Sequence, residues 1–319
     1  MNRAAFLGIA LIAIGIFALV FNFNQPVFST FSSSTIEINE KEVIDGKNIE
    51  IIDVNVSSPS VYLIPTDSDE ITIELIGEIS EKTDFEFDVR TRNNKLDVYV
   101  KNSTTVSGWF NFGTMTTNLQ LELHIPRKEY NKINIHSSSG RIIVIDLQAN
   151  KVELRASSGR IEISNVTAES EINLQTSSGR IEAINNTAKS LKARASSGRI
   201  LINGQISEQI STSTSSGSIV LEDYEGDISA QASSGRITIT NDLLVGDINV
   251  STSSGRVEID FKNAPTSALI DFQGSSGKGE VNIPVINFEE KSNNRVYGTI
   301  GTGEYEIKVR TSSGRFELN

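Results

Sequence analysis

The sequence contains no cysteine, only two histidines and a single tryptophan among its 319 residues. Without cysteine, disulfide bonds, thiolate metal sites and a lipid-modified cysteine anchor are all excluded. The two histidines, His124 and His136, do not form a zinc-binding spacing such as H-E-x-x-H. No phosphate-binding Walker loop and no G-x-S-x-G nucleophile elbow is present either. We therefore expect no metal, no cofactor and no enzymatic activity.

The charge balance is acidic, with 40 acidic and 29 basic residues and a net charge of −11. Proteins that bind nucleic acid usually present a basic domain, so nucleic acid is not an expected partner. Secreted eukaryotic domains of this size more often carry disulfides. The composition therefore favours a bacterial envelope protein.

The N-terminus carries an uncharged, mostly apolar run from Ala4 to Phe23. A helix of about 20 such residues spans a bilayer core, whereas a cleaved signal peptide has an apolar run of about 7–15 residues followed by small residues. We expect residues 1–23 to be an uncleaved transmembrane anchor, with a cleaved signal as the alternative. Arg3 precedes the run and the next basic residue is Lys41, so the positive-inside rule places the N-terminus in the cytoplasm and the rest outside.

The motif Ser-Ser-Gly recurs with a nearly constant spacing through the second half of the chain. The spacings between successive glycines are 19, 20, 19, 19, 18, 20, 22 and 37 residues, and the last suggests one degenerate unit. A fixed period of this length predicts stacked, near-identical units. The glycines are Gly140, Gly159, Gly179, Gly198, Gly217, Gly235, Gly255, Gly277 and Gly314.

Apolar residues recur at fixed positions around each glycine, two and four residues after it and seven before it, as in Ile181, Ala183 and Ile172 around Gly179. A spacing of two is the strand period, so each unit reads as two short strands joined by the Ser-Ser-Gly corner. The glycine suits a corner that needs either a positive φ or a close backbone approach. The chain is therefore expected to be all-β, a parallel β-helix or β-solenoid of about 19-residue coils stacked about 4.8 Å apart.

The region before the regular repeats also shows strand alternation, for example at Phe85, Phe87 and Val89, but it lacks the corner motif. We divide the chain into the anchor (1–23), a linker (24–35), an irregular β region (36–131) and the solenoid repeats (132–319). Residues 36–131 are either a separate β domain or irregular coils that cap the solenoid. A cap is expected because an open end would expose unpaired strand edges.

A row of arginines follows the glycines and is the first candidate site. Stacked coils would place these side chains in an outward column, where their guanidinium groups could bind phosphate or sulfate of a polyanion such as teichoic acid, an acidic glycan or anionic lipid headgroups. Alternatively, the arginines pair with glutamates two residues later, such as Glu162 and Glu258, and keep the rod soluble. The row consists of Arg141, Arg160, Arg180, Arg199, Arg236, Arg256 and Arg315.

Two further candidates are weaker. The segment with Trp109, Phe110 and Phe112 could contact a membrane or stack on a sugar, or it could plug the core. Asp223 and Asp247 could approach each other through stacking and form a carboxylate pair like those of polysaccharide-acting β-helix enzymes.

The combination of features resembles a known bacterial family. A hydrophobic N-terminus, the element Val61-x-Leu63-x-Pro65 and many Ser-Ser-Gly coils with alternating isoleucines are similar to the "putative adhesin" family, domain of unknown function 4097, over about residues 36–319. The resemblance implies a β-solenoid at the cell envelope without known catalytic residues. The expected function is a non-enzymatic, membrane-anchored extracytoplasmic scaffold or adhesin that binds an envelope polymer, a protein or a surface. The alternatives are an envelope-stress sensor acting through protein contacts and a polysaccharide-acting enzyme.

Overall fold

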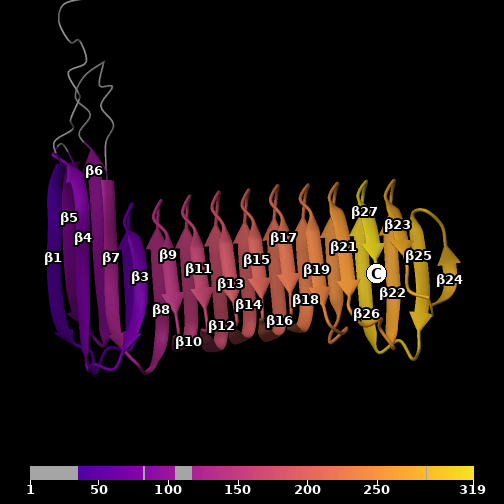
Figure 1. Cartoon of the computed structure of the whole chain (residues 1–319), viewed down its shortest axis with the longest axis horizontal. Helices are drawn as coiled ribbons and strands as arrows, with labels where there is room; N and C mark the ends of the chain where they lie inside the picture. Colours follow the sequence, from indigo (N-terminus) through magenta and orange to yellow (C-terminus); the bar gives the residue numbers. More distant parts are fainter. Residues whose placement is uncertain (1–34, 82, 105–116, 285) are drawn as a thin grey trace, which may run out of the picture.

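The computed structural model describes residues 35–319 apart from 82, 105–116 and 285. Every regular element in this part is a strand, and the strands form two long sheets along a single rod (Figure 1). No helix among these residues is both long enough and apolar enough to cross a membrane. The transmembrane helix expected within residues 1–23 lies outside the described residues.

The two sheets, called sheet A and sheet B below, have 13 and 14 strands. The spatial order in sheet A is β1 (Thr35–Asp45), β4 (Glu70–Ser80), β7 (Thr117–Pro126), β3 (Ser60–Thr66), β9 (Ile142–Ile145), β11 (Ile161–Ser164), β13 (Ile181–Ile184), β15 (Ile200–Asn203), β17 (Ile219–Glu222), β19 (Ile237–Asn241), β21 (Arg256–Phe261), β27 (Arg315–Leu318) and β23 (Lys278–Val281). The order in sheet B is β24 (Asn287–Lys291), β25 (Arg295–Ile300), β22 (Ala268–Gly274), β26 (Tyr305–Thr311), β20 (Ile248–Thr252), β18 (Glu225–Ala232), β16 (Ile206–Thr214), β14 (Thr187–Ala195), β12 (Thr167–Thr176), β10 (Gln148–Ala156), β8 (Glu129–Ser137), β2 (Ile51–Val56), β6 (Lys95–Thr104) and β5 (Thr83–Arg92).

Each repeat contributes one strand to each sheet. β12 of sheet B leads through the Ser-Ser-Gly corner into β13 of sheet A, and a second corner leads back to β14. Successive coils pair in parallel and in register, so Ile172 lies between Val152 and Leu191. All three side chains are buried, as are the matching isoleucines of sheet A. The stack therefore encloses a continuous apolar core, and the all-β, solenoid-like architecture is confirmed.

The corner glycines are required by close packing between coils. None of the nine has a positive φ. A Cβ added to Gly179 would overlap the carbonyl oxygen of Gly159 in the preceding coil, and Gly198 stands in the same relation to Gly179. Of the two reasons that the sequence offered for glycine, close backbone approach is therefore the correct one.

From Gly140 to Gly255, a hydroxyl side chain holds this corner in every second coil. The amide of Gly179 donates to Thr176 Oγ1 at 3.0 Å, and the amide of Gly217 donates to Thr214 Oγ1 at the same distance. The coils between them carry alanine three residues before the glycine, as at Ala195. The repeat thus has a two-coil rhythm in its polar contacts.

The positive backbone angles occur at the second corner, where the chain passes from sheet A back to sheet B. Asn165 and Asn185 have φ values of 55° and 53°, and Gly204 occupies the equivalent position with φ 66°. Asn, Asp and Gly tolerate this left-handed conformation better than other residues. The Asn165 side chain also donates to Asp146 Oδ1 of the neighbouring coil at 3.0 Å.

The N-terminal part of the described chain continues both sheets. β2 pairs with β8 and β3 pairs with β9, both in parallel. Farther out the pairing becomes antiparallel, with β4 between β1 and β7 in sheet A and β5 against β6 in sheet B. Both outermost strands are rich in exposed charge, which discourages pairing with another chain.

The C-terminal end departs from the order expected for a simple solenoid. β26 lies between β20 and β22, and β27 lies between β21 and β23, so the last coil is inserted between two coils that precede it in the chain. The long spacing before Gly314 therefore does not mark a degenerate coil. Its extra residues form the antiparallel pair β24 and β25, which covers the far end of sheet B before the chain turns back (Figure 1).

The two corners predict losses of stability of different size on substitution by alanine. Gly198→Ala should lower the free energy of unfolding by about 4 kcal/mol or more, because its Cβ meets a backbone oxygen that cannot move without breaking the coil stack. Asn185→Ala should lower it by only about 1–2 kcal/mol, the strain of a left-handed alanine. Urea unfolding monitored by circular dichroism measures both, and equal losses would contradict the packing explanation.

Candidate functional site

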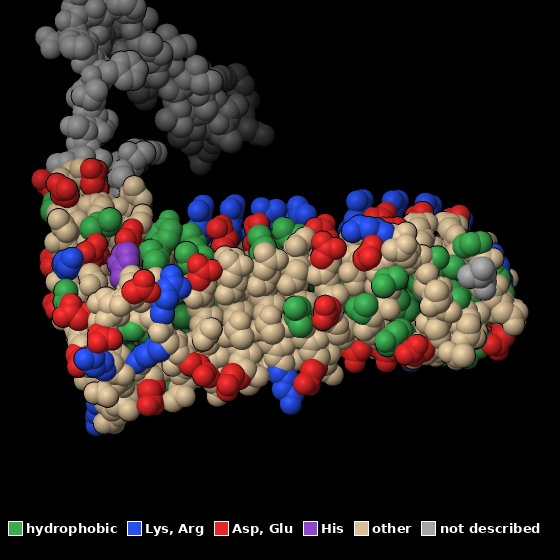
Figure 2. Space-filling model, turned by 60° about the horizontal axis from the view of Figure 1, so that its bottom comes forward, with side chains coloured by type: hydrophobic (Ala, Val, Ile, Leu, Met, Phe, Trp, Pro, Cys, Tyr) green, Lys and Arg blue, Asp and Glu red, His purple; other side chains and the backbone are tan. Residues whose placement is uncertain are grey.

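The seven arginines of the repeat lie along one edge of sheet A. The amide of Ile181 donates to the carbonyl oxygen of Arg199 in the next coil, and Arg256 pairs with Arg315 in register. Neighbouring backbone positions are therefore one strand spacing apart, about 4.8 Å. Figure 2 shows the line of basic side chains along this edge of the rod, with acidic side chains beside it. In spatial order the row reads Arg141, Arg160, Arg180, Arg199, Ser218, Arg236, Arg256, Arg315 and Lys278.

Four of these arginines form ion pairs with a parallel row of glutamates on sheet A. Glu162 pairs with both Arg160 and Arg141, at 3.2 and 3.6 Å. Arg180 pairs with Glu182 at 3.8 Å and Arg256 with Glu258 at 3.1 Å. Because the arginine side chains are 36% to 46% exposed, each pair contributes only about 0–1 kcal/mol to stability.

The centre of the row has no such counter-charge. Two residues after Arg199 the chain has Leu201, and two residues after Arg236 it has Thr238. Among the described residues, neither guanidinium makes an ion pair or a side-chain hydrogen bond. These two exposed cations flank Ser218, so the row contains a short segment where the positive charge is not neutralised. The sequence shows that glutamate is absent two residues after Arg199 and Arg236. The register of the coils determines that these two unpaired arginines belong to one segment of the row.

A polar pocket of about 420 Å³ lies on the sheet B side of the same Ser-Ser-Gly corner. Corner serines from neighbouring coils, among them Ser233, Ser253 and Ser312, line it together with Gln231 and Gln273. It spans β18, β20, β26 and β22, beneath the far end of the arginine row. The corner therefore presents cations on one flank and hydroxyl and amide groups on the other.

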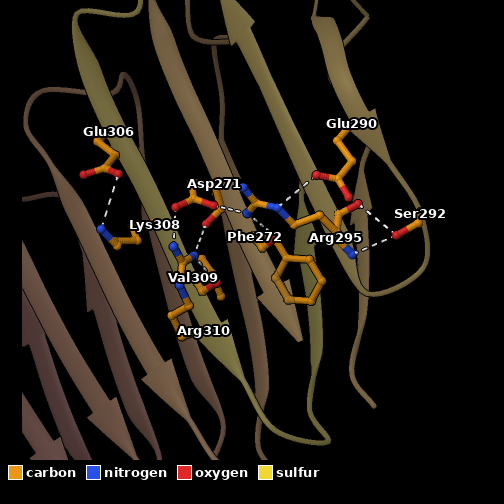
Figure 3. Close-up of polar contacts among 9 residues, drawn as sticks. All are labelled: Asp271, Phe272, Glu290, Ser292, Arg295, Glu306, Lys308, Val309 and Arg310. Carbon is orange, nitrogen blue, oxygen red and sulfur yellow. Dashed lines mark hydrogen bonds and ion pairs between the residues drawn. The ribbon is translucent and has the colours of Figure 1, made fainter. Parts of the chain in front are cut away.

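Arg310 also lines this pocket, and an ion-pair cluster holds it in place. Its guanidinium pairs with Asp271 of β22 and donates to the Asp271 carbonyl oxygen at 2.7 Å. Arg295 of β25 pairs with the same carboxylate from the other side and with Glu290 at 3.4 Å (Figure 3). The Asp271 carboxylate thus connects the inserted coil to the strand pair that covers the end of the rod.

The electrostatics of Asp271 follow from this position. Burial alone would raise the pKa of the Asp271 carboxyl, but hydrogen bonds from Arg310 and Arg295 outweigh burial and lower the pKa below its ordinary value. The residue is 8% exposed, so its charge is only partly screened by water. Asp271 is therefore a structural anion, and this role could not be predicted from the sequence because its partners are 24 and 39 residues away.

The remaining sequence candidates do not converge. Trp109, Phe110 and Phe112 lie outside the described residues. Asp247 Oδ1 accepts the Glu306 amide at 2.8 Å, a contact between coils. No contact among the described residues joins Asp247 to Asp223, which occupies a left-handed corner position.

The Asp271 cluster predicts a pH-dependent contribution to stability. Because the pKa is lowered in the folded protein, the contribution is present above the ordinary value of 3.8 and is lost as the pH falls below it. Asp271→Asn should lower the free energy of unfolding by about 2 kcal/mol at pH 7, and the difference from the parent should shrink toward pH 3. Urea unfolding at several pH values measures this, with the exposed Asp223→Asn as the control. A difference that stays constant down to pH 3 would contradict the assignment.

Comparisons with known proteins agree with the fold. The structure of a "putative lipid binding protein" from Parabacteroides distasonis is 16% identical, covers 88% of this chain and 97% of its own, and superposes with a TM-score of 0.53. A "putative adhesin" from Bacteroides fragilis is 12% identical, with coverages of 90% and 98% and a TM-score of 0.43. A second "putative adhesin" from P. distasonis is 11% identical, with coverages of 88% and 97% and a TM-score of 0.40. At these identities the likeness concerns the fold alone.

The search of curated proteins found no match. The family model described as Toastrack DUF4097 matches residues 49–319, which is most of the chain. This agrees with the resemblance drawn from the Ser-Ser-Gly coils. The protein belongs to the Toastrack DUF4097 family.

Proposed function

We propose that this protein is a non-enzymatic, membrane-anchored extracytoplasmic scaffold that binds an anionic polymer of the cell envelope along its arginine row. The observation that carries the proposal is the unpaired central segment with Arg199 and Arg236. These side chains lie in register two coils apart, with only Ser218 of the intervening coil between them. A polymer with repeated phosphate, sulfate or carboxylate groups could contact several coils at once.

The chemistry of the row suits such a ligand. Arginine guanidinium groups present planar pairs of donors that match phosphate and carboxylate oxygens. The four paired arginines could exchange their glutamate partners at small cost, because exposed ion pairs are weak. The polar pocket on the other side of the corner adds hydroxyl and amide groups suited to sugar or polyol units.

The binding proposal predicts a position-specific effect. Binding of dextran sulfate and of polyphosphate to the purified chain should weaken about tenfold in Arg199→Gln/Arg236→Gln, because two unpaired cations are lost. It should also weaken between 0.05 and 0.5 M NaCl as the screening length falls. Fluorescence anisotropy with labelled polymer measures both effects.

The control carries the same change in net charge elsewhere. Arg92 and Arg194 are exposed on sheet B, away from the row, and make no ion pair within the described residues. Arg92→Gln/Arg194→Gln should therefore bind like the parent, and uncharged dextran should bind none of the variants. Equal losses in the two double variants would reduce the binding to net charge and contradict a site on the row.

The anchor is proposed from the apolar run of residues 4–23. The protein is expected to stay in the membrane fraction after an alkaline carbonate wash, and its intact mass should include the N-terminal segment. A mature protein that begins near Ser29–Ser34 would show cleavage and remove the anchor from the proposal. Protease added to intact cells should degrade the repeats, since they are expected outside the membrane.

A further inference from the structure

Three side chains with metal-binding chemistry meet on the outer face of sheet A near its N-terminal end. Glu74 of β4 lies directly opposite Glu122 of the antiparallel strand β7. His124 follows two residues later in β7 and therefore points to the same face. One donor atom from each of the three lies within 4.8 Å of the other two. This end of the rod is separate from the central segment of the arginine row.

The pair of opposed carboxylates would be unfavourable without a cation between them. Like charges directly across two strands destabilise the pairing. Here the side chains are only 29% and 22% exposed, so water screens the repulsion incompletely. In the described structure Lys41 Nζ contacts Glu74 Oε1 at 2.7 Å, and its hydrogen bond lowers the pKa of the Glu74 carboxyl. Lys41 is 56% exposed on the edge strand β1, so its side chain can turn into water.

The geometry between His124 and Glu122 matches two ligands of one metal ion. His124 Nε2 lies 3.2 Å from Glu122 Oε2. Two ligand atoms that are each about 2.0–2.1 Å from a tetrahedral Zn²⁺ stand about 3.3 Å apart. Glu74 then needs only a small side-chain rotation to complete three protein ligands.

A neighbouring amide orients the central ligand. Gln120 Nε2 donates to Glu122 Oε1 from the same face of β7, which leaves Glu122 Oε2 directed toward His124. Hydrogen bonds of this kind fix ligand orientation at metal sites and strengthen binding. The register supplies this arrangement without any loop, since all four side chains stand on two paired strands.

We propose that Glu74, Glu122 and His124 form a Zn²⁺ site with a fourth position open to water. One imidazole and two carboxylates are a ligand set for Zn²⁺, whereas Ca²⁺ and Mg²⁺ require oxygen ligands and more of them. The sequence by itself predicts no metal site because its two histidines do not form a zinc-binding spacing. The spacing Glu122-x-His124 was present, but Glu74 is 48 residues earlier and joins it only through strand pairing.

The test uses the full-length chain in detergent, without a histidine tag and treated with a chelator. Titration with ZnCl₂ followed by calorimetry should show one site per chain, and Ca²⁺ or Mg²⁺ should not compete at tenfold excess. His124→Gln and Glu122→Gln should each weaken Zn²⁺ binding at least tenfold. His136→Gln, the only other histidine variant possible, should leave it unchanged.

The Zn²⁺ affinity of a Lys41 variant distinguishes metal binding from a purely structural role of the cluster. Because Lys41 competes with the metal for Glu74, Lys41→Ala should tighten Zn²⁺ binding about twofold to fivefold, the equivalent of one exposed ion pair. Bound Zn²⁺ should also raise the melting temperature of the parent but not of His124→Gln. Absence of saturable binding, or equal loss in His124→Gln and His136→Gln, would overturn the proposal.

Discussion

The close approach of one coil to the next is the constraint on which the rest of the structure depends. At each Ser-Ser-Gly corner the glycine Cα lies so near the preceding coil that no side chain fits, as at Gly179 against Gly159. This contact keeps successive strands at hydrogen-bonding distance in both sheets at once. The register that follows aligns the isoleucines inside and the arginines outside. The apolar core and the charged edge are thus two results of a single backbone contact.

The same register determines what the surface can do. A parallel stack repeats each outward position at a constant interval, so one residue type in the repeat becomes a row on the rod. Where the repeat changes, the row changes locally: Leu201 and Thr238 in place of glutamate leave two arginines without partners. Specific features of this protein therefore arise from departures from the repeat, because a uniform repeat would give a uniform surface.

The sequence was sufficient to predict the stacked all-β architecture, the buried rows and the arginine column, because all of them follow from period and alternation. It was not sufficient for features that depend on pairing between distant segments. Asp271 meets Arg295 and Arg310 only because the last coil is inserted beside β22. The left-handed corner at Asn165 and Asn185 was also missed, although Asn, Asp and Gly at that position were a readable signal.

Because of the inserted coil, the last strands do not join the stack in the order in which they are synthesised. The strands β22 and β23 are made before β26 and β27, yet within the stack they contact the rest of the rod through them. While the chain emerges, the earlier coils of the repeat can add one after another, but β22, β24 and β25 can pair only with one another until residues 305–318 arrive. A ribosome that stops within that interval leaves an unfinished end with two exposed strand edges. Recognition of such an edge by a protease or a chaperone would distinguish truncated chains from complete ones.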